Sequence, residues 1–314
     1  MRLPPRFPLA VLPTPLVRAH RLEAALRCGP VLLKRDDLAG FAAAGNKTRP
    51  LEYLVGAALA EGADVLVTGG GPGSNFCPAA ALAARAAGLD CELVVWGDVA
   101  GSANLALAAA AGARLQPTGE ADREAVDTLV DSRAAELTAQ GRRPYAVPRG
   151  GSTGVGAAGF AVAAVELADQ LGAPPALIVL AVGSGGSVAG LVTGLAAVGL
   201  AWPVLGVSVS RPLLEITDRV TELAGECAAL LAAPVPPPPE LVDARGAGFG
   251  VASPQERGCA RLALHTEGML LDDTYGAEAF TVLVDRVRAD QGGPVVYWHT
   301  GGLIPAIATL TEAG

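Results

Sequence analysis

Lys47 stands between a glycine turn that ends at Gly45 and a predicted helix over residues 48–61. The N-terminus of a helix disfavours a cation, which would help to lower the pKa of this lysine. A neutral amine is what a Schiff base requires, so the setting predicts covalent chemistry at Lys47. The alternative is that Lys47 is an ordinary solvated surface lysine without a chemical role. A nucleotide-binding P-loop is a further alternative, but Asn46 separates Gly45 from Lys47 and breaks the required Gly-Lys pair.

Two glycine-rich segments follow predicted strands and precede predicted helices. Residues 69–75 end in Ser74 and Asn75, which would lie at a helix N-terminus where backbone N–H groups can face an anion. A simple capped turn is the alternative there, and the dinucleotide pattern G-x-G-x-x-G is not met. Residues 183–187 read GSGGS, a glycine nest with two hydroxyls. This segment predicts a phosphate site, since ligands of open α/β sheets bind at such strand ends.

Two late segments carry further polar side chains. Tyr275 precedes a predicted helix, and residues 297–302 end a predicted strand with His299 and Thr300. The alternative for Tyr275 is a helix-start residue with a hydrated hydroxyl. For His299 we favour a satisfied core histidine over a catalytic one.

These segments need a scaffold in which strands and helices alternate. Short apolar strands followed by Ala-rich helices imply βαβ units, and so an α/β fold with parallel or mostly parallel sheets flanked by helices. The proline-rich residues 234–239 predict a surface loop. The expected strands are 31–34, 65–68, 92–96, 177–182, 204–209 and 295–299. The expected helices are 48–61, 78–87, 104–111, 121–140, 153–171, 187–197, 253–265 and 276–291.

The composition limits the class of partner. The chain has 314 residues, of which 51% are hydrophobic and 17% charged, with a net charge of −8. Scattered basic residues on an acidic chain argue against nucleic acid and anionic membranes. Five cysteines without C-x-x-C spacing and three histidines give no metal pattern and fit a reducing, cytoplasmic compartment.

A signal peptide and a membrane span are not expected. Prolines interrupt the N-terminal segment, which lacks a continuous apolar core. Residues 170–210 carry no charge and could span a bilayer by length. Glycines and Pro203 divide that run into strand, loop, helix and strand, which is typical of a buried parallel sheet.

Together these motifs resemble one family. Residues 13–16 (PTPL), 33–38 (LKRDDL), 45–49 (GNKTR), 150–152 (GGS) and 299–302 (HTGG) occur in the order seen in the D-cysteine desulfhydrase and 1-aminocyclopropane-1-carboxylate (ACC) deaminase family. The resemblance implies a fold-type II (tryptophan-synthase β-like) enzyme that uses pyridoxal 5′-phosphate. It also implies a homodimer, with a large domain formed by residues 1–48 and 150–314 and a small domain formed by residues 49–149.

The resemblance further implies roles for individual residues. Lys47 would form the Schiff base and act as the base at the substrate α-carbon. Ser74 would hold the substrate carboxylate, and Asn75 would bond the phenolic oxygen of the cofactor. Thr300 would face the pyridine nitrogen, and Tyr275 would line the substrate pocket and act in leaving-group or ring chemistry. The phosphate would be held by Gly183, Ser184, Gly185, Gly186 and Ser187.

The chain departs from the family where the substrate would lie. Gly73 and Phe76 flank Ser74-Asn75 where polar residues are usual, Phe249 stands where a second pocket tyrosine is common, and Gly276 replaces a glutamate of ACC deaminases. We therefore predict a lyase or deaminase that acts on a small, cysteine-like amino acid by α,β-elimination. The alternatives are ring opening or β-replacement on a specialised biosynthetic substrate, and a pyridoxal-phosphate-binding protein that has lost catalysis.

Overall fold

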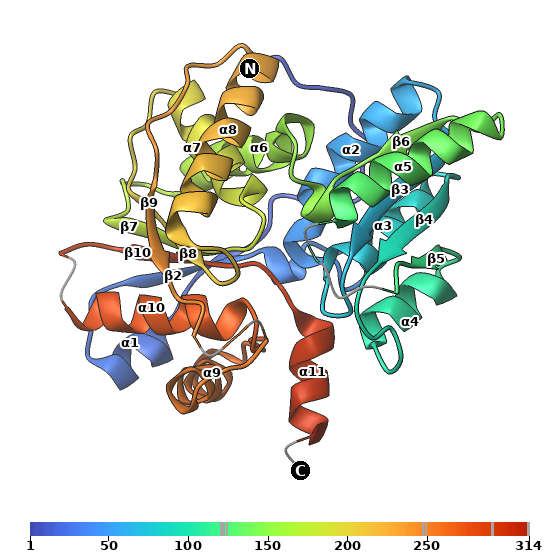
Figure 1. Ribbon diagram of the computed structural model, residues 1–314. Helices are drawn as coiled ribbons and strands as arrows, with labels where there is room; N and C mark the ends of the chain where they lie inside the picture. Colours follow the sequence, from blue (N-terminus) through green and yellow to red (C-terminus); the bar gives the residue numbers. More distant parts are fainter. Residues whose placement is uncertain (120–122, 124, 247, 249, 290–291, 313–314) are drawn as a thin grey trace.

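The structure is a computed structural model and describes residues 1–119, 123, 125–246, 248, 250–289 and 292–312. Within these ranges, six strands form one sheet in the order β1-β2-β10-β7-β8-β9 (Figure 1). Only the outer pair β1–β2 is antiparallel. The central strand β10 pairs Val295 with Val31 on one side and Leu177 on the other. The strands are β1 (Leu16–Arg18), β2 (Val31–Arg35), β7 (Leu177–Val182), β8 (Val204–Ser208), β9 (Glu240–Asp243) and β10 (Val295–His299).

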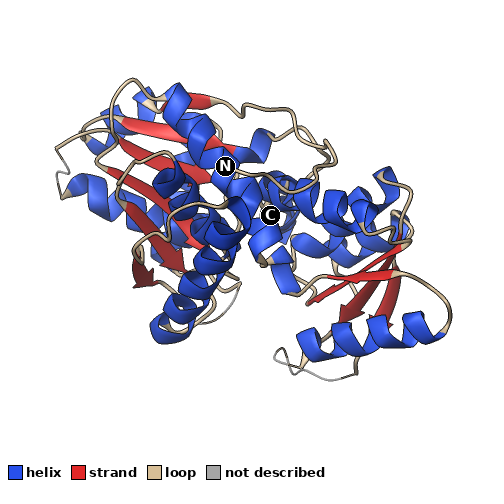
Figure 2. Cartoon of the chain, turned by 90° about the horizontal axis from the view of Figure 1, so that it is seen from above, coloured by secondary structure: helices blue, strands red, loops and turns tan. Residues whose placement is uncertain are grey.

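A second sheet is built from the middle of the chain. Its described strands run β5-β4-β3-β6, all parallel. They are β3 (Val65–Gly70), β4 (Asp90–Val95), β5 (Arg114–Pro117) and β6 (Pro144–Ala146). Figure 2 shows the two groups of strands, each with helices packed against it.

Helices cover both faces of the large sheet. One face packs on the first, ninth and tenth helices, and the other on the sixth, seventh and eighth. The small sheet packs on the third and fifth helices from opposite sides. The helices are α1 (His20–Leu26), α2 (Thr48–Ala60), α3 (Phe76–Ala86), α4 (Ala103–Ala110), α5 (Val126–Ala139), α6 (Gly154–Gln170), α7 (Gly186–Ala197), α8 (Leu213–Leu231), α9 (Pro254–Glu267), α10 (Gly276–Arg288) and α11 (Leu303–Glu312). Short 3-10 turns occupy Asp36–Leu38, Gly45–Lys47 and Arg149–Gly151.

The α/β class with mostly parallel sheets is confirmed, and each expected strand overlaps an observed one. The short strands β1, β5, β6 and β9 were not expected, because three or four residues carry too little alternation to read. Helices α1, α8 and α11 were also missed. For α8 the signal was present, since Ile216, Val220, Leu223, Cys227 and Leu231 recur at helical spacing and are buried.

Some helix limits were wrong. The helix expected over 121–140 begins at Val126, and residues 121, 122 and 124 lie outside the described part of the chain. The helix expected from residue 78 begins two residues earlier, at Phe76. The helix expected to reach residue 291 ends at Arg288. The proline-rich residues 234–239 lie in a loop and are mostly exposed, as predicted.

Candidate active site

A cavity of about 440 Å³ opens where the carboxyl ends of strands from both sheets meet. The loops β3–α3 and β7–α7, the loop after β10 and the turn before α2 all line it. Phe249 lies outside the described residues. The other side chains and glycines predicted for the site line this one cavity: Lys47, Ser74, Asn75, Phe76, Gly183, Ser184, Gly185, Gly186, Ser187, Tyr275 and Thr300.

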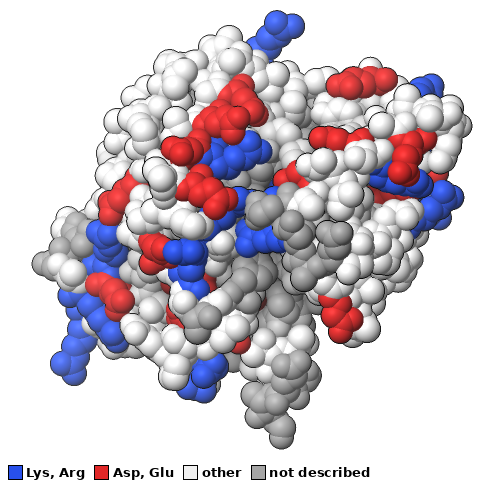
Figure 3. All heavy atoms as spheres, viewed as in Figure 1, with Lys and Arg blue, Asp and Glu red and all other residues white. Residues whose placement is uncertain are grey.

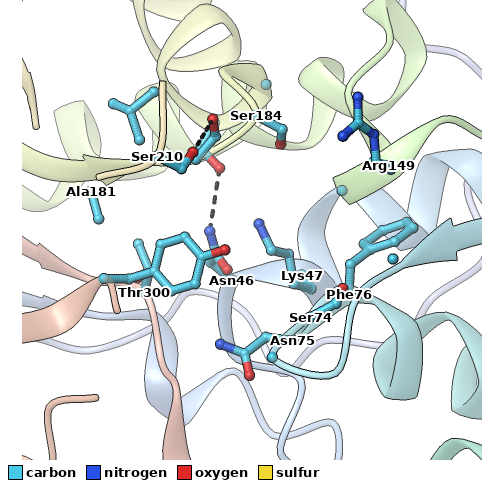
Figure 4. Close-up of a pocket in the computed structure, with 18 of the residues that line it drawn as sticks. Asn46, Lys47, Ser74, Asn75, Phe76, Arg149, Ala181, Ser184, Ser210 and Thr300 are labelled. Carbon is cyan, nitrogen blue, oxygen red and sulfur yellow. Dashed lines mark hydrogen bonds between the residues drawn. The ribbon is translucent and has the colours of Figure 1, made fainter. Parts of the chain in front are cut away.

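Lys47 ends a 3-10 turn and is the N-cap residue of α2. Its side chain is partly buried, and burial lowers the pKa of the amine to about 8. No residue of the described structure supplies a carboxylate or a hydrogen bond that would hold the charged form. Figure 4 shows the amine of Lys47 pointing into the space between Ser184 and Asn75. A substantial fraction of this amine is therefore neutral near neutral pH.

A buried ionic cluster fixes the helix that carries Lys47. Arg49, two residues further on, donates from Nε to Asp36 Oδ2 over 2.8 Å and from Nη2 to Glu166 Oε1 over 2.9 Å. Asp36 follows β2 and Glu166 belongs to α6, so the first turn of α2 is tied to the large sheet and its helical cover. Removing one partner of such a buried cluster costs about 3–5 kcal/mol, because the other charge is left uncompensated.

Residues 183–187 form an anion cradle at the N-terminus of α7. The N-cap Gly185 has φ +95°, a left-handed conformation that favours glycine, and no side chain caps the helix. Its first N–H groups therefore stay available to a ligand. Ser152 Oγ donates to Ser184 Oγ over 2.6 Å, which fixes one cradle hydroxyl. A Cβ added to Gly150 would lie 2.5 Å from that same Ser184 oxygen.

Ser74 and Asn75 lie where β3 turns into α3. Asn75 is the N-cap residue of α3 but makes no side-chain cap; instead its Oδ1 accepts from Asn104 Nδ2 over 3.2 Å. Ser74 Oγ accepts a long 3.4 Å hydrogen bond from the N–H of Cys77. Phe76 also lines the cavity, but its ring is buried in the core of the small sheet.

Tyr275 packs against Gly183, the first residue of the cradle. A Cβ added to Gly183 would lie 2.9 Å from Tyr275 Cε1, so the ring packs on glycine backbone. Burial, and then the nearby Asp272, raise the pKa of Tyr275 above its usual range, so its hydroxyl stays protonated. His299 is buried, its Nδ1 accepts from the N–H of Gly301, and burial lowers its pKa to about 4. These features fit a neutral core histidine.

Several lining residues received no role from the sequence. Asn46 donates from Nδ2 to Ser187 Oγ over 3.2 Å, and Ser210 Oγ donates to the carbonyl of Gly183 over 3.2 Å. Asn46 lies inside the GNKTR motif of residues 45–49, so its neighbours in the sequence were the available signal. The remaining lining residues without a predicted role include Trp96, Arg123, Arg149, Arg211 and Asp272.

Comparison with known proteins identifies the family of the chain. Residues 8–301 match the family model described as pyridoxal-phosphate dependent enzyme, so the chain belongs to that family and the predicted cofactor is confirmed. The D-cysteine desulfhydrase of Salmonella choleraesuis is 36% identical over 311 residues, covering 95% of this chain and 94% of that protein. The crystal structure of an ACC deaminase homologue superposes with a TM-score of 0.93 at 34% identity, covering 98% of this chain and 95% of the other.

A more distant structure defines the architecture alone. The L-serine ammonia-lyase of Rhizomucor miehei superposes with a TM-score of 0.67 at 24% identity, over 97% of this chain and 98% of the other. The fold-type II prediction is thereby confirmed. The described residues hold no group of three or more His, Cys, Asp or Glu side chains suited to a metal ion. No described helix is long and apolar enough to cross a bilayer. On the face shown in Figure 3, acidic and basic side chains are interspersed.

The residues of the cavity fit pyridoxal phosphate. An aldehyde needs an amine, and the amine of Lys47 lies in the cavity with a lowered pKa. A phosphate dianion needs convergent N–H and O–H donors, and the glycine backbone with its two hydroxyls at the α7 N-terminus provides them. A Cβ at Gly150 would collide with the Ser184 hydroxyl of this cradle, so a glycine is needed there.

Proposed function

We propose that this protein is a lyase that removes a β-substituent and the amino group from a small, cysteine-like amino acid. The carrying observation is that Lys47, with its pKa lowered to about 8, lies in the same cavity as the anion cradle of residues 183–187. The relative named D-cysteine desulfhydrase, which the chain matches over nearly its whole length, supports the choice of substrate class.

Four side chains of the cavity would each have a separate role in this reaction. Lys47 would hold the cofactor covalently, and its freed amine would then remove the proton from the substrate α-carbon. When bound, pyridoxal phosphate supplies an electron sink for the charge that develops at that carbon. Ser74 would hold the substrate carboxylate. Asn75 would orient the cofactor by a hydrogen bond to the phenolic oxygen of the cofactor. Tyr275, kept protonated by burial, would donate to the leaving group.

The second candidate is ring opening of ACC, and the protonated hydroxyl of Tyr275 is the observation that favours it. In the resembled family that reaction also uses a second tyrosine and a glutamate. This chain has Phe249 and Gly276 at those two positions. General acid–base help from such groups is typically worth about 10²–10⁴-fold. Elimination of a good leaving group needs less help, so we rank it first. β-Replacement would share the elimination half of the reaction. Loss of Lys47 would favour a cofactor-binding protein without catalysis, and Lys47 is present.

Two assays on the purified, cofactor-loaded protein test the proposal. Pyruvate should form from D-cysteine or β-chloro-D-alanine, and α-ketobutyrate from ACC should be negligible. Rapid formation of α-ketobutyrate from ACC without any formation of pyruvate would contradict the elimination proposal. Loss of substrate without either keto acid, when a thiol is added, would point to β-replacement.

We also propose the remaining organisation implied by the resemblance. Residues 49–149 would form a small domain within a large one, and the separate sheet of β3 to β6 supports this division. The chain would act as a homodimer in the cytoplasm, which its five free cysteines suit. Sedimentation of the holoprotein tests whether it is a homodimer, and fractionation of source cells tests whether it is cytoplasmic.

A further inference from the structure

The N-terminal end of α4 is bonded to the loop that joins β3 to α3. Ser102 Oγ donates a hydrogen bond to the carbonyl of Pro72 over 2.8 Å. Asn104 Nδ2 donates to Asn75 Oδ1 over 3.2 Å. Pro72 and Asn75 line the active-site cavity, whereas Asn104 is not among the described residues that do so. The amide of Asn104 can therefore influence the cavity through Asn75 without touching a bound group.

Helix formation does not account for Asn104. The N-cap of α4 is Ser102, whose Oγ already accepts the N–H of Leu105. Every other residue of α4 is alanine or leucine. Asn104 is 4% exposed, and a buried amide costs free energy unless it is hydrogen-bonded. Asn104 Oδ1 has no hydrogen-bond partner in the described part of the chain, so the bond to Asn75 is what this buried amide contributes.

The bond from Asn104 decides which end of the Asn75 amide faces the cavity. An asparagine side chain carries an acceptor oxygen at one end and a donor NH₂ group at the other. Because Oδ1 of Asn75 is turned toward Asn104, the Nδ2 end remains for a bound group. Figure 4 shows the oxygen of Asn75 on the side away from Lys47. Asn75 is half-buried and thus presents a hydrogen-bond donor to the cavity that it lines.

The covalent structure of pyridoxal phosphate indicates which of its atoms would meet this donor. The ring carbon that bears the aldehyde lies between the carbon that bears the phenolic oxygen and the carbon that bears the phosphate arm. With the aldehyde at Lys47 and the phosphate in the cradle, the phenolic oxygen would lie on the side of Lys47 away from the cradle. Figure 4 shows Ser184 of the cradle and Asn75 on opposite sides of the Lys47 amine. An ionised phenolic oxygen accepts hydrogen bonds, and Nδ2 of Asn75 can donate one.

We infer that Asn104 is a positioning residue, which holds Asn75 in the orientation that lets Asn75 Nδ2 donate to the phenolic oxygen of bound pyridoxal phosphate. The inference rests on the proposed function, which gives Asn75 that contact. Recognition of the phenolic oxygen then depends on a residue of α4 that lies behind the cavity wall. Without Asn104, the amide of Asn75 is free to turn its oxygen toward the phenolic oxygen, and two acceptors that face each other repel.

The test compares two ligands of the intact protein, pyridoxal phosphate and its 3-deoxy analogue, which lacks the phenolic oxygen. Equilibrium dialysis gives the Kd of each. The ratio of the Kd of the analogue to the Kd of pyridoxal phosphate measures recognition of the phenolic oxygen, because effects on folding or on the phosphate cradle change both values alike. Asn75→Ala sets the ratio without the contact. The wild-type ratio should exceed it by about tenfold or more, since hydrogen bonds to charged groups are strong.

Two variants of Asn104 remove the donor in different ways. Asn104→Leu has nearly the same shape and suits an apolar helix, and its ratio should fall by about threefold or more, toward that of Asn75→Ala. In the Asn75→Ala background the same change should have no further effect on the ratio. Asn104→Asp, when ionised, can only accept, so it should turn Asn75 Nδ2 away from the cavity and lower the ratio below that of Asn104→Leu.

Ser102→Ala is the matched control. It removes the other bond from α4 to the same loop, and it should leave the ratio at the wild-type value even if both Kd values rise. A merely structural role for Asn104 would give the same pattern as Ser102→Ala.

The outcomes separate this inference from the proposed function. A ratio that falls in Asn104→Leu, falls further in Asn104→Asp and is kept in Ser102→Ala supports the inference. A wild-type ratio in Asn104→Leu overturns it, and so does an equal fall in Ser102→Ala. Equal ratios in the wild type and Asn75→Ala overturn it as well, because Asn75 would then make no contact for Asn104 to position. The proposed function fails separately, if borohydride does not fix the cofactor to Lys47, whatever the ratios.

Discussion

Asn46 donates a hydrogen bond from Nδ2 to the hydroxyl of Ser187 over 3.2 Å, across 141 positions of sequence. The bond joins the residue before Lys47 to the first turn of α7. It therefore couples the amine that would hold the cofactor aldehyde to the cradle that would hold its phosphate. A cofactor bound at both ends needs these two parts at a fixed spacing, and this bond helps to set that spacing.

The first prediction concerns Lys47. The cofactor-loaded protein should be yellow, and borohydride should fix the cofactor to the peptide that contains Lys47. Because burial lowers the pKa of Lys47 to about 8, cofactor capture by the apoprotein should accelerate as the pH rises toward 8 and level off above it. Absorbance after mixing measures the rate, and peptide mapping locates the adduct.

The chain offers a built-in control, since Lys34 is its only other lysine. Lys34 is fully buried and bonded to Glu166, Gln170 and the carbonyl of Thr14. Lys47→Ala should lose the adduct without transferring it. Cofactor fixed to Lys34 in the wild type would show that the assignment of the amine is wrong.

The second prediction concerns the anion cradle. Gly185→Asp should weaken cofactor binding strongly. A Cβ there would lie 3.1 Å from Val220 Cγ2, so the new carboxylate would be buried beside apolar side chains of α8, next to the nest that would hold the phosphate dianion. Any side chain at Gly185 meets its φ of +95°, so strain must be separated from charge. Gly185→Asn has the same shape and strain but no charge. Equilibrium dialysis should find the Asp variant at least tenfold weaker than the Asn variant; equal affinities would remove the cradle from the site.

The third prediction concerns Tyr275. Burial keeps its pKa above the usual range, so the hydroxyl can donate a proton but does not act as a base. Tyr275→Phe should lower kcat for D-cysteine by about 10²-fold or more, and lower it much less for β-chloro-D-alanine, whose chloride leaves without a proton. Cofactor content should be unchanged.

Tyr297→Phe provides the matched comparison. The Tyr297 hydroxyl is buried and donates to the carbonyl of Gly276 over 3.0 Å, and the residue is not among those that line the cavity. Removal of this hydroxyl should lower Tm but leave unchanged the ratio of kcat for D-cysteine to kcat for β-chloro-D-alanine. An equal loss for both substrates in Tyr275→Phe would argue against proton donation to the leaving group.

The fourth prediction concerns pH and stability. Glu278 is 1% exposed, and neither carboxylate oxygen has a hydrogen-bond partner among the described residues. Burial, followed by Glu256, Asp272 and Asp243, raises its pKa from 4.5 to about 9. Between these values the folded protein binds a proton that the unfolded chain does not. The contribution of Glu278 to the free energy of unfolding therefore falls as pH rises through this window.

Glu278→Gln should remove that dependence. Its free energy of unfolding in urea should exceed that of the wild type by more at pH 8 than at pH 5, since only the wild type must retain a proton against rising pH. Glu61→Gln removes the same charge from an exposed position and should leave the slope unchanged. Parallel pH profiles for the wild type and Glu278→Gln would refute the buried, protonated state.

Local sequence was enough to predict the class of the fold and many of the residues that line the cavity. Glycines that allow left-handed backbone, apolar runs that suit parallel strands and a lysine at a helix start are features of short segments, and they predicted Lys47, the cradle and the alternation of strands and helices. Helix α8 could also have been predicted from the sequence, because its buried apolar residues recur at helical spacing. Strands of three or four residues such as β1 and β6 depend on their neighbours in the sheet, so they escaped prediction.

Tertiary structure alone decided which distant groups meet and how far each is removed from water. The contacts of Asn46 with Ser187 and of Ser152 with Ser184 join separate elements, and no spacing along the chain specifies them. Burial leaves Asp272 Oδ2 without a hydrogen-bond partner among the described residues, and it lowers the pKa of Lys47. Burial depends on what packs around a side chain from all directions, whereas a motif records only its neighbours along the chain.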